Sequence, residues 1–417
     1  MVEPGGYSTT ENKNIPNVSK PPSPLRLDGR DHQQFILNGV LPKQSQIFLP
    51  SLDQDKKTMS EARSRVAHQP LHPSIRDKLD PEYVSLHDEV LQYVKPSESQ
   101  GWTPESRKFV SPLGAGAQKD VEVGSITNHE IENGIQARIF TPEGESVSSE
   151  GWPCLVWLHG GGWVNGGLNS ENGFLRHFCK YLKCVVCTIN YRHAPEHLYP
   201  TAVEDSLTGL KWLVKSENSK AMSIDTNKLI FGGLSAGGNL MAILSLKASQ
   251  LETPIRPIFQ FFICPVIDNT ATIETRWATS RHSPWLTPQR MTWYRERYFG
   301  TKDTDRTKEW TASPCFAPEE LLRLYPKTFV AVAECDLLAP EGLGFAEHLQ
   351  KLGVSTEVKI YKGATHSILI LAGVHQIGKQ LVHDVCERVA AELGISYDRE
   401  LANIENQGNS TWESRHE

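Results

Sequence analysis

Strand-like and helix-like segments alternate along this chain from about residue 120 to about residue 395. Runs rich in β-branched and aromatic residues predict the strands, and apolar residues at steps of three and four predict the helices. Consecutive strands separated by a helix pair in parallel, because the helix returns the chain to the same end of the sheet. The alternation therefore predicts an α/β fold in which a mostly parallel central sheet carries helices on both faces.

The predicted strands are short, and Ile258–Cys264 is apolar almost throughout, which predicts a strand buried on both faces. The strands are expected at 121–126, 135–140, 154–159, 182–191, 228–232, 258–264, 328–334 and 356–361. The helices among them are expected near 203–214, 236–251, 343–352 and 374–393, with Gly394 ending the last one.

The overall charge and hydropathy exclude several classes of protein. The 417 residues include 43 Lys and Arg against 49 Asp and Glu, so the formal net charge is −6 and no basic surplus is available to bind nucleic acid. No apolar run approaches the roughly 18 residues of a membrane span, and the chain does not begin with an apolar leader. We therefore expect a cytoplasmic protein with no nucleic-acid partner and no membrane span.

The eight cysteines show no framework of short spacings, which indicates reduced thiols. Cys184 and Cys187 form a C-x-x-C, but they lie inside a predicted strand. Residues three apart point to opposite faces of a strand, so this pair is ill placed for a disulfide or a shared metal ion. Buried thiols are the prediction here, rather than a redox or zinc site.

A G-x-S-x-G pattern at Gly233–Gly237 follows a predicted strand directly and opens a predicted helix. This is the setting of a nucleophile elbow, in which a sharp strand-to-helix turn exposes the serine hydroxyl. Larger side chains at Gly233 and Gly237 would collide with the neighbouring strand and helix. The pattern predicts Ser235 as a nucleophile, and the alternative is a helix cap made of small residues.

Three consecutive glycines follow the predicted strand at 154–159, in the run His159–Trp163. Glycines let backbone N–H groups approach a ligand closely, and acyl transfer needs such donors for the oxyanion of the tetrahedral intermediate. We expect the amides of Gly161, Gly162 and Ala236 to form this oxyanion hole. His159 is expected to organise the loop, and a flexible turn is the alternative for the glycine run.

Asp336 and His366 each come just past the end of a predicted strand, so both should emerge at the edge of the sheet where Ser235 lies. Their order, Ser then Asp then His, is that of α/β-hydrolases. His366 would take the serine proton, and Asp336 would fix its tautomer and stabilise the imidazolium. The rival acids are Glu334 and Asp268, and the rival histidines are His282, His348, His375 and His383.

These patterns resemble the hormone-sensitive-lipase-like carboxylesterase branch of the α/β-hydrolases over about residues 80–395. The resemblance rests on the glycine run, the elbow, Tyr191–His197, Tyr199–Asp205 and Ser313-Pro314. It implies an α/β-hydrolase fold with a helical cap over the active site, and ester substrates of short or medium acyl chain. Two residues depart from the family pattern: Leu234 stands where an acid or Thr usually precedes the serine, and Ser367 stands where Gly usually follows the histidine.

The resemblance and the composition together suggest a domain organisation. Nine of the 26 prolines fall in the first 75 residues, which predicts an irregular extension over 1–70. A helical cap segment is expected over 71–119, the catalytic domain over 120–397 with a cap insert at about 269–312, and a polar tail over 398–417. Four aromatic residues of the insert are expected either to line an acyl pocket or to pack the cap on the body: Trp277, Trp285, Trp293 and Tyr294.

The predicted function is hydrolysis of small-molecule esters through an acyl-enzyme, with no metal or organic cofactor. Three alternatives remain open: an amide or formamide hydrolase, a deacylase serving one metabolite, and a non-catalytic receptor like the plant gibberellin receptors. Those receptors lack the catalytic histidine, whereas this chain keeps His366. The oligomeric state is also open, with a homodimer as one alternative.

Overall fold

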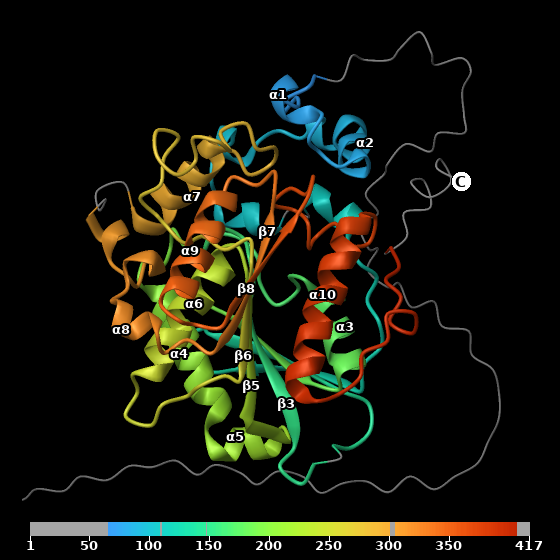
Figure 1. The fold of residues 1–417 in the computed structure, drawn as a ribbon, viewed down its shortest axis with the longest axis vertical. Coiled ribbons are helices and arrows are strands. Elements are labelled where there is room, and N and C mark those ends of the chain that lie inside the picture. Colours follow the sequence, from blue (N-terminus) through green and yellow to red (C-terminus); the bar gives the residue numbers. More distant parts are fainter. Residues whose placement is uncertain (1–65, 109–110, 147, 301–304, 407–417) are drawn as a thin grey trace, which may run out of the picture. The chain divides into compact units, whose positions relative to one another are not determined.

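Eight strands form one sheet in the order β1-β2-β4-β3-β5-β6-β7-β8 (Figure 1). The computed structural model describes residues 66–108, 111–146, 148–300 and 305–406. The strands are β1 (Ser125–Glu130), β2 (Gln136–Thr141), β3 (Trp152–Leu158), β4 (Val185–Asn190), β5 (Ile224–Leu234), β6 (Phe259–Ile263), β7 (Lys327–Ala333) and β8 (Thr356–Tyr361). β2 pairs antiparallel with β1 and with β4, and all the other pairs are parallel. The predicted mostly parallel sheet is confirmed.

Helices cover the sheet on both faces, as expected (Figure 1). On one face lie α4 (Thr201–Val214), α6 (Ala236–Ser249) and α9 (Ala339–Lys351), and on the other lie α3 (Asn172–Leu182) and α10 (Gln376–Leu393). Cys187 belongs to the core under the first group and Cys184 to the core under the second. The two cysteines therefore face opposite sides of β4, and all eight cysteines, which lie in described parts of the chain, are free thiols.

Two elements differ from the sequence prediction. β1 begins at Ser125 rather than at 121, because it is an exposed edge strand whose register is set by the hairpin turn at Asn133 and Gly134, both with positive φ. α3 was not predicted, although Phe174, Phe178 and Leu182 recur at helical spacing and are buried. A left-handed Glu171 at φ 53° precedes this helix, and no side chain caps it, so the usual start signal is missing.

Three helices lie outside the sheet layers, over the carboxyl edge of the sheet: α1 (Pro73–Arg76), α2 (Pro81–Glu89) and α7 (Pro288–Phe299). We call these helices and the segments that connect them to the sheet the roof. Figure 1 shows α1 and α2 beyond the end of the sheet at which β7 finishes. The shorter elements are α5 (Ser216–Ala221), α8 (Glu319–Leu322) and the 3₁₀ turns η1 (Leu91–Tyr93), η2 (Ser97–Ser99), η3 (Pro104–Lys108), η4 (Pro112–Gly116), η5 (Asp305–Lys308) and η6 (Pro314–Phe316).

The predicted extension and tail at the two ends of the chain are described only in part. Most of the expected extension, residues 1–65, and most of the expected tail lie outside the described residues. The described part of the tail packs on the body, since Ala402 and Ile404 are buried and Asn406 pairs with Gln118. The domain bounds themselves stay predictions. Among the helices described here, none has the length and apolar character needed to cross a bilayer.

Candidate active site

Ser235 occupies a tight turn between the end of β5 at Leu234 and the start of α6 at Ala236. Its backbone lies at φ 57° and ψ −119°, a conformation that non-glycine residues adopt only when their surroundings force it. The glycines make room for this turn. A Cβ at Gly233 would lie 2.4 Å from the Gly237 oxygen, and one at Gly237 would lie 2.0 Å from the Leu158 oxygen. The turn therefore presents Ser235 at the carboxyl edge of the sheet.

Three distant segments bring a hydroxyl, an imidazole and a carboxylate into contact. His366 Nε2 lies 2.9 Å from Ser235 Oγ, and His366 Nδ1 lies 2.8 Å from Asp336 Oδ2. Because Asp336 accepts a hydrogen bond at Nδ1–H, Nε2 is left free to accept the serine proton. Asp336 is 1% exposed and the His366 side chain 13% exposed, so water reaches this chain of contacts only from the side of the cavity.

Backbone hydrogen bonds hold the two loops that follow β7 and β8 in register. Cys335 N–H donates to the Ala364 oxygen at 2.8 Å, and Gly363 N–H donates to Glu334 Oε2 at 2.9 Å. Asp80 N–H, at the start of α2, donates to the Gly363 oxygen at 3.0 Å. The loop that carries the catalytic-type histidine is thus fixed both by the neighbouring loop and by the roof.

The rival acids and histidines have other partners. Glu334 is tied to Lys362 and Gly363, and Asp268 accepts from Arg276 Nε at 2.6 Å. His282 is exposed and stacks on His72, with ring centroids 3.7 Å apart. His375 lies 3.1 Å from Asp80, His383 bonds Tyr397 Oη at 2.7 Å, and His348 lies within α9. Of these candidates, the structure brings only His366 and Asp336 to Ser235.

The expected oxyanion donors lie around the same serine. Gly161 and Gly162 have φ of 119° and 61°, which suit glycine, and a Cβ at Gly162 would strike the Tyr294 ring at 2.3 Å. Ala236 is the first residue of α6, so its N–H has no acceptor within the helix. All three positions border the serine or line its cavity.

His159 contacts the backbone of the glycine loop, as expected for a residue that organises it. It is fully buried, its Nδ1 lies 2.8 Å from the Gly160 oxygen, and its ring stacks on Tyr191 at 4.5 Å. Burial lowers the pKa of His159 to about 4, so the imidazole is neutral near pH 7. A neutral, stacked ring that bonds the loop backbone is a structural support rather than a base.

A cavity of about 980 Å³ opens over Ser235 and His366. Trp285, Trp293 and Tyr294 line it, whereas Trp277 does not. Trp277 instead donates through Nε1 to the buried Glu341 at 2.7 Å, which ties the roof to the body. The four aromatic residues of the insert therefore divide: three line the cavity, and one packs the insert on the sheet.

Sequence profiles of two protein families match this chain. One, described as the α/β hydrolase fold, matches residues 155–370, and a carboxylesterase family profile matches residues 86–196. An AB hydrolase superfamily protein of Schizosaccharomyces pombe is 34% identical over 337 residues, which make up 77% of this chain and 96% of that protein. The chain belongs to the α/β-hydrolase fold family. The predicted recognition of its hormone-sensitive-lipase-like carboxylesterase branch is confirmed.

Relatives of this α/β hydrolase carry names of ester-cleaving enzymes. The ethyl acetate hydrolase of Pseudomonas putida is 29% identical, over 58% of this chain and 73% of that protein. A fungal esterase from Rhizomucor miehei superposes with a TM-score of 0.65 at 28% identity, covering 76% of this chain and 97% of that one. The chain is accordingly an ester-cleaving hydrolase.

Two of the motifs that carry the resemblance, Tyr191–His197 and Tyr199–Asp205, form ion pairs that stabilise the segments around the hydrolase site. Arg192 pairs with Asp205 through its Nε and Nη2, at 2.9 and 2.7 Å. Glu196 accepts from Arg107 Nη1 at 2.9 Å, and Arg107 Nε donates to the Val164 oxygen at 2.6 Å. The motif around Glu196 thus ties the segment before β1 to the glycine loop.

Two residues near the reacting groups escaped the sequence analysis. Glu171 lines the cavity and accepts a hydrogen bond from Trp157 Nε1 at 3.1 Å. The Gly160 N–H favours the ionised form of its carboxyl group. Burial raises the pKa of Glu171 to about 7. Its position shortly after the glycine run was the one available signal, since nothing in its local pattern marks a buried acid.

Cys264, which follows β6, is the second residue that was missed. Its Sγ, an Asp336 carboxylate oxygen and a His366 ring nitrogen all lie within 4.8 Å of one another. Burial raises the pKa of the Cys264 thiol well above its usual value, and the neighbouring Asp336 carboxylate raises it further. The thiol therefore keeps its proton and can donate a hydrogen bond to Asp336.

Proposed function

We propose that this enzyme hydrolyses carboxylic esters of small or medium acyl chain through an acyl-enzyme, with Ser235, His366 and Asp336 as a catalytic triad. The observation that carries the proposal is the pair of contacts from Ser235 Oγ to His366 Nε2 and from His366 Nδ1 to Asp336, at 2.9 and 2.8 Å. A serine is a weak nucleophile unless an adjacent base takes its proton, and this arrangement supplies the base and orients it.

The reaction has two halves that use the same groups. Ser235 Oγ attacks the ester carbonyl carbon while its proton passes to His366 Nε2, and the amides of Gly161, Gly162 and Ala236 hold the oxyanion. Collapse of this intermediate expels the alcohol, which takes the proton from His366. Water then attacks the acyl-enzyme with His366 again as base, and the acid leaves as Ser235 regains its proton. Asp336 stays ionised throughout and stabilises the imidazolium.

The size of the substrate and the cellular location of the enzyme are also part of the proposal. The aromatic cavity over Ser235 supports an ester with apolar groups, and the relative named ethyl acetate hydrolase supports a small one. We propose a small-molecule partner, action in the cytoplasm and no requirement for a bound cofactor. Matched ester and anilide substrates separate an esterase from an amide hydrolase, through the ratio of their kcat/KM values.

Replacement of the nucleophile tests the mechanism. The variant Ser235→Ala should fold normally, and its kcat on p-nitrophenyl butanoate should fall on the order of a million-fold. Ser245→Ala, in the helix that follows Ser235, is the matched control and should keep full activity. An alkyl phosphonate should label the wild type on the 233–239 peptide. Turnover by Ser235→Ala at the wild-type rate, or labelling of another peptide, would reject the proposal.

A further inference from the structure

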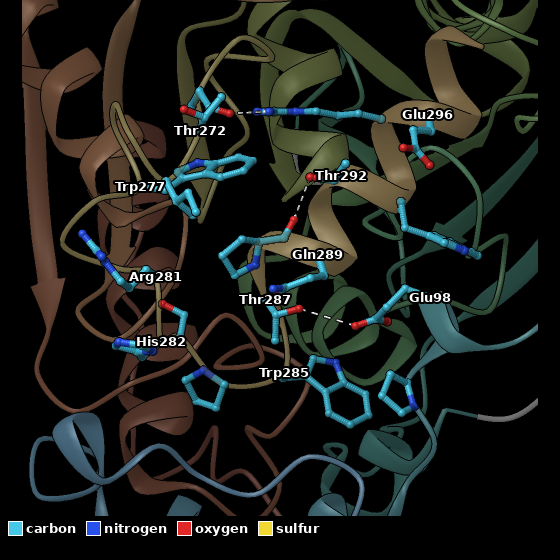
Figure 2. Close-up of a pocket in the computed structure, with 18 of the residues that line it drawn as sticks. Glu98, Thr272, Trp277, Arg281, His282, Trp285, Thr287, Gln289, Thr292 and Glu296 are labelled. Atoms are coloured by element: carbon cyan, nitrogen blue, oxygen red, sulfur yellow. Dashed lines mark hydrogen bonds between the residues drawn. The ribbon is translucent and has the colours of Figure 1, made fainter. Parts of the chain in front are cut away.

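A second cavity, of about 1490 Å³, lies in the roof, and Figure 2 shows residues that line it. Its lining comes from the segment before α1, from α2 and η2, and from the stretch between β6 and the end of η5. Trp285 and Trp293 line both cavities. The two spaces are therefore neighbours that share an aromatic wall, and Figure 2 shows Trp285 at the edge of the second one.

Trp285 has an unusual backbone for so large a residue. Its φ is 65°, in the left-handed region that favours glycine. Such a conformation costs free energy and persists only where the surroundings impose it. The side chain is partly buried and packs against the small apolar cluster that includes Ile75 and Tyr83, so apolar packing contributes to its placement.

Arg290 holds Trp285 from two directions. Its Nη1 donates to the Trp285 oxygen at 2.5 Å, and its guanidinium lies 4.8 Å from the centre of the indole ring. The first contact fixes the backbone and the second fixes the face of the ring. Arg290, on the helix that follows, therefore contributes to the position of both the backbone and the ring of Trp285.

Arg290 is itself fixed by a buried network. Its Nε donates to Glu98 Oε2 and its Nη2 to Gln69 Oε1, both at 2.8 Å. Glu98 also accepts from Thr287 Oγ1 at 3.4 Å, a contact drawn in Figure 2. The Arg290 side chain is 5% exposed and that of Glu98 16%. Burying an ion pair of this kind costs free energy of desolvation. Of the two partners, Arg290 is the one that contacts Trp285.

We infer that Trp285 is a specificity-determining partition that ends the substrate cavity and limits the length of the apolar chain an ester can carry. The inference rests on the proposed ester hydrolysis and concerns the size of the substrate. Beyond Trp285 the second cavity is lined by Trp277, Phe299 and prolines, together with charged side chains that include Arg281 and Glu296. An apolar chain that passed the indole would run along the aromatic and proline surfaces. Removal of the indole would join the two spaces and let a longer chain pass.

A chain-length series tests the partition. Trp285→Gly is the primary variant, because glycine adopts φ 65° without strain. For this variant, the ratio of kcat/KM on p-nitrophenyl decanoate to that on p-nitrophenyl butanoate should rise at least about tenfold over the wild type. The same comparison on acetate esters of butanol and decanol tells whether the acyl or the alcohol part passes the indole. Trp285→Phe, which keeps most of the wall, should give an intermediate ratio.

The matched control for relief of backbone strain is Lys183→Gly. Lys183 also has a positive φ, 48°, but it is an exposed residue at the end of α3 that lines neither cavity. Its chain-length ratios should equal those of the wild type. Thermal unfolding of each variant shows whether the roof has stayed folded.

Binding separates failure of the inference from failure of the proposed function. In the Ser235→Ala background nothing is turned over, and Trp285→Gly should tighten the binding of decanoate esters relative to butanoate esters. A wild type that cleaves no ester in a Ser235-dependent way would reject the proposed function alone. A folded Trp285→Gly enzyme whose ratios are unchanged in both series, or whose decanoate and butanoate rates fall alike, would overturn the partition.

Discussion

The floor and the roof of the substrate cavity are built by different means. On the floor, Ser235, Asp336 and His366 sit one to five residues past the ends of β5, β7 and β8, and backbone hydrogen bonds fix their loops. In the roof, Trp285 lies just before α7 and contacts Arg290, which pairs with Glu98. Trp293 lies within α7 and packs against Trp102. The floor inherits its geometry from the sheet, whereas the roof depends on contacts between side chains.

This difference predicts a division of roles. Groups held by the sheet can keep the sub-ångström geometry that proton transfer requires, because many strand hydrogen bonds would have to move together. Groups held by one ion pair can be exchanged without disturbing the sheet. Changes in the floor should therefore lower kcat, and changes in the roof should alter stability and substrate size.

The largest effect after loss of the nucleophile is expected at the carboxylate of the floor. In Asp336→Asn the geometry survives, but the amide no longer favours the tautomer with the proton on Nδ1, and it cannot stabilise the imidazolium. We expect kcat on p-nitrophenyl butanoate to fall on the order of 10⁴-fold, with an unchanged melting curve. Steady-state kinetics with circular dichroism gives both measurements.

Glu334→Gln is the control for this variant, since Glu334 lies two residues away and faces Lys362 instead of His366. Its kcat should stay within about twofold of the wild type. Equal losses in the two variants would mean that the loop after β7 acts through its fold alone, and the distinction between floor and roof would fail at its strongest point.

Gly162 is where floor and roof touch, so it tests how far the two are separate. Gly162→Ala forces a Cβ to within 2.3 Å of the Tyr294 ring at a backbone φ of 61°, and the oxyanion amide should shift. We expect kcat to fall about 10²- to 10³-fold, with a smaller change in KM. The double variant Gly162→Ala/Tyr294→Ala removes the clash and should recover part of this loss.

Gly134→Ala is the matched control for backbone strain, because Gly134 has a φ of 83° with nothing within 4 Å of its Cβ position. It should lower stability slightly and leave kcat unchanged. If Gly162→Ala behaved in the same way, the amide of Gly162 would have no part in the reaction.

Glu98→Gln sharpens the comparison from the side of the roof. The amide keeps the shape of the contacts but leaves the Arg290 charge, 5% exposed, without its counter-ion. Breaking a buried pair costs about 3 kcal/mol, so the melting temperature should fall by several degrees. The rate on butanoate should stay within about threefold, since the floor is untouched.

Glu296→Gln is the control for Glu98→Gln, because Glu296 is an exposed acid of the same roof, visible in Figure 2. Its melting temperature should match the wild type. A fall of kcat in Glu98→Gln that outweighs its loss of stability would show that the roof takes part in the chemistry.

The division between floor and roof also explains what could be predicted from the sequence. The positions of Ser235, Asp336 and His366 relative to strand ends are visible in the sequence, because strand pattern and chain order define the carboxyl edge of a parallel sheet. α3 was missed because it begins without a capping signal, and β1 was misplaced because an edge strand lacks a buried face.

The sequence predicted that Trp285 could line a pocket, but the contacts of Trp285, Cys264 and Glu171 were beyond sequence patterns for a different reason. Trp285 depends on Arg290 and on Glu98, which lies far from it in the chain. Cys264 and Glu171 act through residues that only the fold brings near them. Contacts of this kind have no periodicity and no fixed spacing, so the pattern of the sequence does not predict them.

The smallest expected effect is a pH-dependent change in stability at Glu171, on the boundary between the floor and the glycine loop. Burial raises the pKa of Glu171 to about 7 in the folded protein, against an ordinary value of about 4.3 for a free glutamate. The unfolded chain therefore ionises first as the pH rises, and the wild type loses stability between about pH 4 and pH 7.

Glutamine does not titrate, so the melting temperature of Glu171→Gln minus that of the wild type should increase between about pH 4 and pH 7. After allowance for solvent in the cavity, we expect about 1 kcal/mol, or about 2 °C. The difference for Glu334→Gln should instead fall as the pH rises towards about 4.3 and stay level above it, because Lys362 and the Gly363 amide lower the pKa of Glu334 and stabilise its ionised form in the folded state. A difference that stays flat for Glu171→Gln from pH 4 to pH 8 would mean that burial does not raise the pKa of this carboxyl in the folded protein.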